Sequence, residues 1–397
     1  MTRSPIEDVW PLSPLQEGLL FHASFDDEGP DVYTIQTGQE LLGPVDPDRL
    51  RRSWGALVAR HAVLRASFRQ VSGAQTVQVI SRHVTLPWRQ ADLSALPEDE
   101  ALAEIERLSE EERAARFDLA VPPLLRVLLV TLGPGRHRMV ITSHHILLDG
   151  WSVPLLLGEL QKVYEAGADV RALPPVRSYR DYLAWLARQD RAAAEEAWRR
   201  ELAGADEPTL VAPADPGRRP VLAEHVVHDL TEAATAGVSE FARGRGLTVN
   251  TVVQAAWALV VARLSGRNDV VFGATVAGRP TELPGVESMV GLFINTVPVR
   301  VPLRGEQPVT ELLTDLQERQ AQLLPHQYLG LTDLQRLAGP GAVFDSLVVF
   351  ENYPHPPARP ASPDTLSIRP VGAAFDSTHY PFTLAVIPGK RIRLRLD

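Results

Sequence analysis

Two adjacent histidines, His144 and His145, stand at the end of a β-rich run in the stretch SHHILLDGWS, which begins at Ser143. An imidazole exchanges a proton near neutral pH, so it can serve as a general acid or base. Asp149 and Gly150 follow after three aliphatic residues. A carboxylate there can bind an arginine or a backbone loop, and a glycine lets the backbone come close to a ligand. The stretch is therefore the first candidate for a catalytic site.

The alternatives to catalysis are a buried structural role, metal binding and covalent hydrolysis. If the strand persists through the pair, its side chains point to opposite faces, so one imidazole faces a cavity and the other faces the interior. Metal binding is disfavoured because no His-x-His or His-Glu-x-x-His spacing accompanies the pair. A Ser-His-Asp hydrolase is disfavoured because the Gly-x-Ser-x-Gly elbow is absent. A buried structural role stays open, and among the catalytic uses of the pair, acyl transfer between two bound substrates remains.

A hairpin and a helix are expected to position these residues. The runs LLRVLLVTL and HRMVITSHH, separated by the turn signal GPGR, predict a hairpin whose second strand ends at the histidines. Ser152 can cap a helix with an apolar face from Leu156 to Tyr164 that stops at Gly167. The motif then lies on strand, loop and helix start, where unpaired N–H groups would favour a developing oxyanion.

The rest of the chain alternates between helical and strand patterns. PDRLRRSWGALVARH predicts a helix, AVLRASFRQ a strand, and EDEALAEIERLSEEERAARF an acidic helix with a solvated charged face. The proline-dotted stretch from Pro174 to about Pro220 indicates a crossing between lobes. We therefore predict an α/β protein of two lobes with mixed sheets, residues 1–175 and residues 176–397.

Composition narrows the class of protein further. The 397 residues include no cysteine, which excludes disulfides and cysteine chemistry and favours a reducing, cytoplasmic setting. The formal charge of −9, from 40 basic and 49 acidic residues, argues against a nucleic-acid partner. No apolar run approaches the roughly 20 residues of a membrane span, and the N-terminal stretch is not a secretory signal. We expect a soluble protein without a nucleic-acid or membrane partner.

The motifs together resemble those of a known family. The residues His144, His145, Asp149 and Gly150 match the HHxxxDG motif of nonribosomal peptide synthetase condensation domains. WPLSPLQEGLLFH is similar to the first motif of that family, RHAVLRASF to the second, YRDYLAW to the fourth and GLFINTVPVR to the fifth. LLPHQYLGLTDLQ and FDSLVVFENYP resemble the sixth and seventh. The resemblance follows the family order along nearly the whole chain.

The resemblance implies a fold and a set of partners. The fold would be two chloramphenicol-acetyltransferase-like lobes, arranged as a V-shaped pseudo-dimer with the motif histidine in a central tunnel. Upstream donor and downstream acceptor peptidyl carrier proteins would supply substrates on phosphopantetheine arms, beside a neighbouring adenylation domain. No cofactor or metal would belong to this chain, which we expect to be monomeric as an excised domain. The family's final segment is expected to be missing from the lobe of residues 176–397.

The resemblance also implies a reaction, in which the amine of a carrier-bound aminoacyl group attacks a carrier-bound peptidyl thioester. An α-amino group titrates near a pKa of about 7.7 to 8.0, so a useful fraction is already neutral and a strong base is unnecessary. His145 would accept a proton or hold the amine and the tetrahedral intermediate by hydrogen bonds. The alternatives are a non-catalytic module that recruits carrier or tailoring proteins, and a CoA-dependent acyltransferase.

Further residues receive roles from the resemblance. His144 would pack in the interior, Asp149 would pair with Arg65, and Gly150 would allow close approach of the backbone to the thioester. Asn295 would lie on a floor loop under the tunnel, with a strand-end amide that satisfies local backbone as the alternative.

Two aromatic residues and the subtype complete the expectations. Tyr182 and Trp185 could line the acceptor side of the tunnel, with core packing as the alternative. The stretches PLSPLQEGLLFH, HHILLDGWS and VFENYP resemble domains that take a donor ending in a D-residue and an L-configured acceptor. The DSL in FDSLVVF lies in a strand pattern, so Ser346 is expected to be structural and not a phosphopantetheine attachment site.

Overall fold

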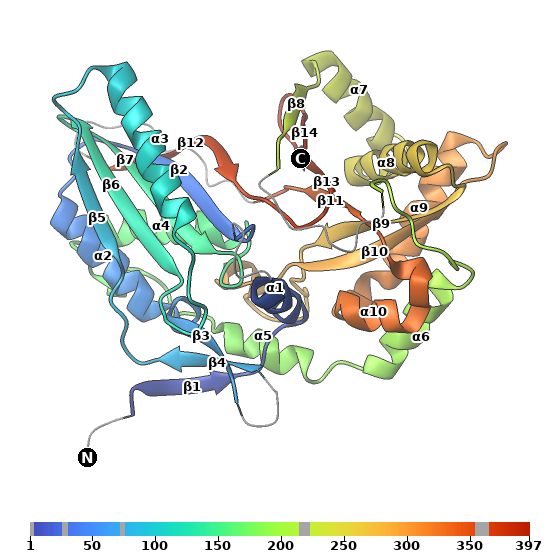
Figure 1. Cartoon of the computed structure of the whole chain (residues 1–397), viewed down its shortest axis with the longest axis horizontal. Coiled ribbons are helices and arrows are strands. Elements are labelled where there is room, and N and C mark those ends of the chain that lie inside the picture. The colour runs from blue at the N-terminus through green and yellow to red at the C-terminus, as the bar shows by residue number, and fades with distance from the viewer. Residues whose placement is uncertain (1–3, 26–30, 72–75, 214–222, 354–364) are drawn as a thin grey trace. The chain divides into compact units, whose positions relative to one another are not determined.

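The structure is a computed structural model that describes residues 4–25, 31–71, 76–213, 223–353 and 365–397 (Figure 1). The chain divides into two compact units. Unit 1 consists of residues 1–187, 279–293 and 353–377, and unit 2 consists of residues 188–278, 294–352 and 378–397. Both units are α/β, as predicted.

The predicted single boundary after residue 175 is wrong, because two later segments return to unit 1. One of them contains β12 (Ser367–Phe375), which pairs with β2 (Thr34–Leu42) and so covers an open edge of the unit 1 sheet. The other, residues 279–293, binds the loop that follows the histidines. Such pairing joins segments that are distant in sequence, so a single cut along the chain cannot describe it.

Unit 1 contains a five-stranded sheet of order β12-β2-β7-β6-β5. The predicted hairpin is confirmed, since β6 and β7 pair antiparallel around the turn at Gly135. The histidine motif therefore begins at the end of the central strand, where Thr34 of β2 lies opposite His144. The remaining strands of this sheet are β5 (Trp88–Asp92), β6 (Leu125–Gly133) and β7 (Arg136–His144).

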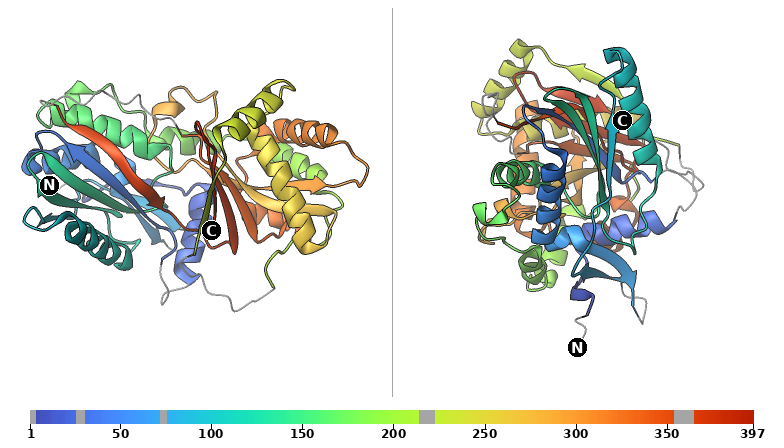
Figure 2. Two further views of the ribbon diagram at one scale, coloured as in Figure 1. Left: turned by 90° about the horizontal axis from the view of Figure 1, so that it is seen from above. Right: turned by 90° about the vertical axis from the view of Figure 1, so that its left-hand side faces the viewer.

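Helices cover both faces of this sheet. In Figure 2, α3 lies on one face, and α2 and α4 lie on the other. Side chains alternate accordingly, because Val140 packs with Leu108 of α3 while Met139 contacts Trp54 of α2. The helices of unit 1 are α1 (Pro14–Phe25), α2 (Pro47–Arg60), α3 (Glu98–Ala114), α4 (Ser152–Glu165) and α5 (Tyr179–Leu186), with 3-10 turns η1 (Ala62–Arg65), η2 (Val170–Ala172) and η3 (Val286–Ser288).

The predicted helix after the motif, α4, is confirmed, but its first residue is Ser152 and its N-cap is Trp151, so the prediction that Ser152 caps the helix is wrong. Its buried residues lie on one stripe, which packs against α2, and the helix ends just before Gly167 in the left-handed region. A second, three-stranded sheet of order β1-β4-β3 completes unit 1. Its strands are β1 (Ile6–Trp10), β3 (Ala66–Gln70) and β4 (Thr76–Ser81).

Unit 2 contains a mixed six-stranded sheet of order β10-β9-β11-β13-β14-β8. Its core joins α8 and α9 to the central strands, with Phe272 and Val348 fully buried. The strands are β8 (Val226–Asp229), β9 (Asp269–Val276), β10 (Asn295–Pro302), β11 (Ser346–Phe350), β13 (Phe382–Ile387) and β14 (Arg393–Leu396). The helices are α6 (Arg191–Leu202), α7 (Glu232–Arg243), α8 (Val249–Ser265), α9 (Val309–Leu323) and α10 (Leu331–Ala338), with 3-10 turns η4 (Leu324–His326) and η5 (Gly339–Ala342).

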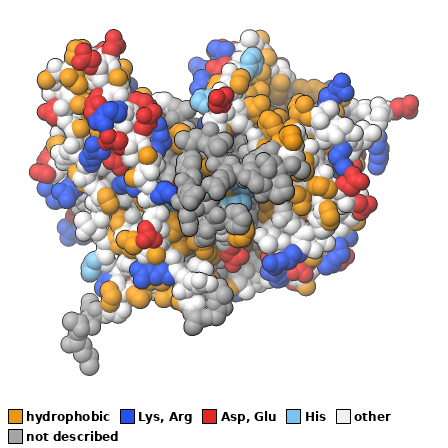
Figure 3. Space-filling view, in the orientation of Figure 1, with side chains coloured by type: hydrophobic (Ala, Val, Ile, Leu, Met, Phe, Trp, Pro, Cys, Tyr) orange, Lys and Arg blue, Asp and Glu red, His pale blue; other side chains and the backbone are white. Residues whose placement is uncertain are grey.

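The apolar helix α8 is only partly covered. Leu259, Val260 and Leu264 are each about half exposed, and hydrophobic side chains gather over α7 and α8 in Figure 3. Within the described ranges, no helix combines the length and the apolar character that crossing a membrane requires.

Candidate active site

The strand β7 ends at His144, so His145 is the first residue of the following turn. Its backbone N–H donates to the carbonyl of Tyr33 at 2.8 Å, and its ring Nδ1 lies 2.8 Å from the carbonyl oxygen of Leu148. A carbonyl only accepts, so Nδ1 must bear the proton. In the neutral ring, Nε2 then has the free lone pair that a general base needs. The ring is half-buried.

His144 points the other way and is fully buried. Its Nδ1 accepts the backbone N–H of Ile146 at 3.1 Å, and its Nε2 lies 3.3 Å from Oδ2 of Asp31. The two histidines thus have different surroundings, and only His145 retains partial exposure.

Asp149 is the centre of a buried polar network. Its Oδ1 accepts the backbone N–H of Ser152 at 2.9 Å and lies 2.7 Å from the Ser152 hydroxyl. Its Oδ2 accepts the backbone N–H of Phe293 at 3.1 Å, and Nη2 of Arg279 donates to both oxygens at 3.1 and 3.2 Å. The carboxylate therefore has the partners that a buried charge requires. The Ser152 N–H at the helix start is occupied by Asp149, and a role of the other N–H groups there toward an oxyanion stays a prediction.

Arg279 connects the network to the segment of residues 279–293. Its Nη1 donates to the carbonyls of Val286 and Met289 at 2.6 and 2.9 Å, and its guanidinium lies 3.9 Å from the ring centre of Phe293. Burial lowers the pKa of Arg279, and the nearby Asp149 carboxylate opposes that shift. The ion pair of Arg279 and Asp149 therefore binds this segment to the histidine motif.

The prediction that Arg65 pairs with Asp149 is wrong. Nη1 of Arg65 lies 2.6 Å from Oε2 of Glu7, and the guanidinium also donates to the backbone carbonyls of Val58 and Ser81. The hydrogen bond from Arg65 lowers the pKa of Glu7. Arg65 lies at the junction of η1 and β3, so its long side chain reaches the small sheet, whereas Asp149 is bound by an arginine 130 residues further along the chain.

Steric packing explains why residue 150 is a glycine, and the sequence did not show this. A Cβ at this position would lie 2.3 Å from Cζ of Tyr353, because the tyrosine ring packs directly on the glycine. Any side chain would therefore displace Tyr353. Close approach of the Gly150 backbone to a thioester stays a prediction.

Tyr182, one of the two predicted aromatic residues, packs against Phe293, whose N–H binds Asp149. Tyr182 is buried, its ring lies 4.7 Å from that of Phe293, and its hydroxyl donates to the Phe293 carbonyl at 3.4 Å. Tyr179 donates similarly to the carbonyl of Leu292 at 2.5 Å, and burial raises the pKa of both tyrosines. Tyr182 is therefore a core residue, which corrects its assignment to a substrate channel. Trp185 stacks on Tyr182 and is partly exposed, so its role stays a prediction.

Asn295 belongs to unit 2 and begins β10. Its amide nitrogen donates to the carbonyls of Gln327 and Leu329 at 2.8 and 2.7 Å, and the residue is buried. Both amide hydrogens are thus used by local backbone, the alternative that the sequence left open. A role of Asn295 in positioning substrate stays a prediction.

Sequence reasoning missed three supporting residues. Arg279 gave no local signal, because its partner is distant in the chain. Ser152 was predicted only as a helix cap, but its hydroxyl lies 2.8 Å from the carbonyl and 3.0 Å from the N–H of Gly291. Gln16, fully buried in the WPLSPLQEGLLFH stretch, donates to the carbonyl of Ile146 at 3.0 Å. Because the polar residues Gln16 and Glu17 stand side by side at the start of α1, the sequence did not show which of them is buried.

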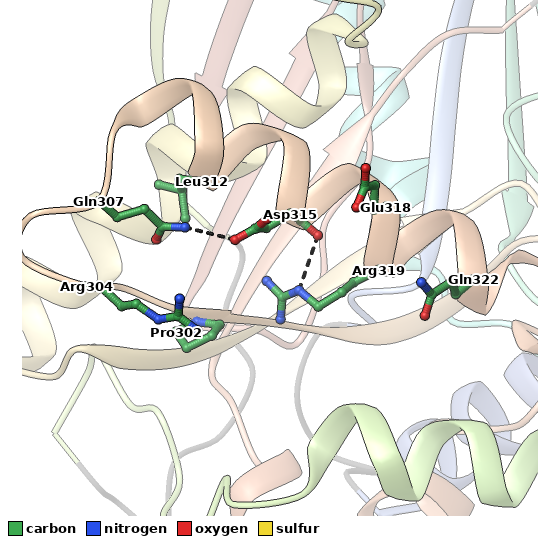
Figure 4. Close-up of a pocket in the computed structure, with 8 residues that line it drawn as sticks. All are labelled: Pro302, Arg304, Gln307, Leu312, Asp315, Glu318, Arg319 and Gln322. Atoms are coloured by element: carbon green, nitrogen blue, oxygen red, sulfur yellow. Dashed lines mark hydrogen bonds between the residues drawn. The ribbon is translucent and has the colours of Figure 1, made fainter.

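A separate pocket of about 260 Å³ lies in unit 2 beside α9 (Figure 4). No predicted site residue lines it; the lining consists of Pro302, Arg304, Gln307, Leu312, Asp315, Glu318, Arg319 and Gln322. Its charges balance, and Arg319 is already bound to Glu201 and to the Asp315 carbonyl. Across the described part of the chain, no group of three or more acidic or histidine side chains is suited to a metal ion.

Known proteins are similar in sequence to this chain over nearly its whole length. A family model described as "Condensation domain" matches residues 6–397. The chain is 38% identical to one of the linear gramicidin synthase proteins of Brevibacillus parabrevis over 98% of this chain and 8% of that protein. It is 33% identical to surfactin synthase subunit 3 of Bacillus subtilis (strain 168) over 100% of this chain and 31% of that protein. The chain thus spans less than a third of the length of either relative.

Solved structures agree on the fold. The first condensation domain of the calcium-dependent antibiotic synthetase, in complex with a substrate analogue, matches with a TM-score of 0.78 and 22% identity over 98% of this chain and 91% of that one. The starter condensation domain of rhizomide synthetase in complex with C8-CoA matches with a TM-score of 0.80 and 19% identity over 98% and 89%. By its family match, its relatives and its fold, the chain belongs to the condensation-domain family of nonribosomal peptide synthetases.

Proposed function

We propose that this chain forms a peptide bond between two carrier-bound substrates. The amine of an aminoacyl group on a downstream acceptor carrier attacks the thioester carbonyl of a peptidyl group on an upstream donor carrier. Family membership supports the reaction class. The observation on which the residue assignment rests is the hydrogen bond from Nδ1–H of His145 to the Leu148 carbonyl, which leaves Nε2 as the proton acceptor.

The step balances without an outside reagent. A C–N bond forms as the C–S bond breaks, and the proton lost by the amine reaches Nε2 of His145 and then the leaving thiolate. Because the Leu148 carbonyl already accepts from Nδ1, the positive charge of the transient imidazolium is stabilised without reorganisation. An attacking amine with a pKa of about 8 is partly neutral at cellular pH, so an ordinary imidazole is sufficient.

The partners we propose are two peptidyl carrier proteins, whose phosphopantetheine arms bring the substrates, and an adjacent adenylation domain. The donor is proposed to end in a D-residue and the acceptor to be an L-aminoacyl group. The similarity of PLSPLQEGLLFH and HHILLDGWS to the corresponding motifs of that subtype supports this choice.

A single-turnover assay followed by intact mass tests the proposal. Donor carriers loaded with peptides ending in a D- or an L-residue are mixed with an aminoacyl acceptor carrier and the protein. We expect peptide mass on the acceptor only with the D-donor, and none with His145→Ala or His145→Gln, since glutamine can donate to Leu148 but cannot take up the proton. His83→Ala, which changes an exposed histidine, is the matched control.

Other outcomes separate the alternatives. Transfer with L-donors alone refutes the D-donor subtype and leaves the reaction. Transfer by His145→Gln at the wild-type rate refutes the proton-acceptor role. Carrier binding without transfer from either donor, in a folded sample, favours the recruitment module, and transfer from an acyl-CoA favours the CoA-dependent acyltransferase.

A further inference from the structure

Two consecutive backbone N–H groups hold the turn that presents His145. The N–H of His145 donates to the Tyr33 carbonyl at 2.8 Å, and the N–H of Ile146 donates to Nδ1 of His144 at 3.1 Å. These bonds fix the direction in which the backbone leaves β7. The ring of His145 is attached between them, so its orientation depends on both.

The residues that accept these two bonds, Tyr33 and His144, both contact the carboxylate of Asp31. Its Oδ1 accepts the backbone N–H of Tyr33 at 3.0 Å, and its Oδ2 lies 3.3 Å from Nε2 of His144. The Asp31 side chain is 5% exposed, and the His144 ring it faces is completely buried. One carboxylate thus supports the two residues to which the turn is anchored.

The hydrogen-bond pattern also defines the tautomer of His144. Because Nδ1 accepts from Ile146, the neutral ring must bear its proton on Nε2, which faces Asp31. One oxygen of the carboxylate accepts from Tyr33, and the other lies 3.3 Å from Nε2 of His144, where its negative charge attracts the proton on that nitrogen. Burial pushes the pKa of Asp31 upward, but the adjacent His144 ring and the backbone N–H of Tyr33 outweigh it, so the pKa is lowered and the carboxylate is ionised at neutral pH.

We infer that Asp31 is a positioning residue for His145, holding the turn through His144 on one side and Tyr33 on the other. It touches no substrate; it acts by keeping the catalytic ring in one orientation and one tautomer. The inference rests on the proposed function of His145. Outer partners of this kind fix which nitrogen of a functional histidine bears the proton.

Two variants of Asp31 remove its hydrogen-bond acceptors to different extents. Asp31→Ala removes both acceptor oxygens. Asp31→Asn keeps the shape but has one oxygen and one NH2 group, so either Tyr33 or His144 then faces a donor. Asp46→Ala is the matched control, because it removes the aspartate that caps α2 and lowers stability without contact with the motif.

The first readout is the rate of peptide transfer at saturating carriers, with the carrier concentration at half-maximal rate measured alongside. A displacement of about 1 Å at a catalytic group can reduce the rate by about 100-fold. We therefore expect a loss of up to about 100-fold for Asp31→Ala, a smaller loss for Asp31→Asn, and an unchanged half-saturating concentration. Asp46→Ala should keep the wild-type rate.

The second readout does not require activity. Long-range proton–nitrogen correlation spectra of protein labelled with ¹⁵N-histidine report which ring nitrogen is protonated, with the His145 signals identified by their loss in His145→Ala. We expect a single Nδ1–H form of His145 in the wild type and a mixture of forms in Asp31→Ala. If the wild type shows no transfer, the proposed function fails, while this spectral change still supports the positioning role.

Two results overturn the inference. One is an unchanged His145 tautomer in folded Asp31→Ala, whatever the activity. The other is a rate loss in Asp31→Asn and Asp31→Ala no greater than that of Asp46→Ala, since the effect would then follow stability alone.

Discussion

The ion pairs of Arg279 and of Arg107 use the same functional groups in opposite surroundings. Arg279 binds Asp149 with side chains that are 5% and 0% exposed, and its partner comes from another part of the chain. Arg107 on α3 binds Glu104 and Glu111 one turn away on either side, and its side chain is 53% exposed. The first pair joins distant segments, whereas the second stays within one helix.

The difference shows that burial, and not the number of contacts, decides what an ion pair does for the protein. Exposed charges keep their water, so pairing changes their free energy little. Buried charges have lost that water, and only their partner and the surrounding hydrogen bonds offset the loss. The Asp149 network therefore works as a unit, and removing one member leaves the rest unsatisfied.

The largest effect is expected for Arg279→Ala. It leaves the Asp149 carboxylate buried without its counter-charge, and loss of one partner of a buried pair costs about 3 to 5 kcal/mol in the free energy of unfolding. Urea unfolding at neutral pH measures it. The double variant Asp149→Ala with Arg279→Ala should be less destabilised than the sum of the single variants. Additive single effects would contradict the coupling.

The loop that contains Asp149 also contains Gly150, whose packing differs from that of Gly158 in the helix that follows. Gly150 packs on Tyr353, whereas Gly158, in the middle of α4, has no atom within 4 Å of a built Cβ. We expect Gly150→Ala to lower the free energy of unfolding by about 1 to 3 kcal/mol through overpacking. Gly158→Ala should raise it by up to about 1 kcal/mol by restricting the unfolded chain. Thermal unfolding compares the two variants.

Removing the tyrosine ring tests the cause of the Gly150 effect. In a Tyr353→Ala background, Gly150→Ala should no longer destabilise, since the atoms that it would meet are gone. A persistent loss there would mean that the backbone of Gly150, and not its packing, requires glycine.

A buried ionisable group with weak pairing should behave differently from Asp149. His137 on β7 is buried, and burial lowers its pKa from 6.5, with Asp92 opposing the shift. Below pH 6.5 the unfolded chain binds a proton that the folded chain does not, so stability falls as the pH decreases from about 7 to 5. His137→Gln should flatten this slope, measured by urea unfolding across that range. An unchanged slope would assign the pH dependence to other groups.

The smallest effect is expected for Arg107→Ala. All three charges of its cluster are solvated, so thermal unfolding should show no measurable change, with or without 0.5 M salt, whose Debye length of about 4 Å already screens such pairs. A clear loss of stability would show that exposed pairs matter more in this protein than the comparison implies.

Local patterns in the sequence were sufficient for the elements and for the position of the motif. The hairpin that ends at His144, the helix that starts at Ser152 and the acidic helix α3 all follow from periodicity and turn residues over short windows. The residues alone identified the histidine pair at a strand end before a helix, and the resemblance to the condensation-domain family selected His145 of the two.

Tertiary structure alone decided which side chains meet. The partner of Asp149 is Arg279 and not Arg65, the ring on Gly150 is that of Tyr353, and the carboxylate behind His144 is Asp31. Each of these contacts joins segments that are distant in the chain, brought together by sheet pairing and burial, and no periodicity records them. The sequence by itself determined what chemistry was present and where along the chain; the fold determined which groups support it, since hydrogen bonds and buried charges are satisfied by proximity in space.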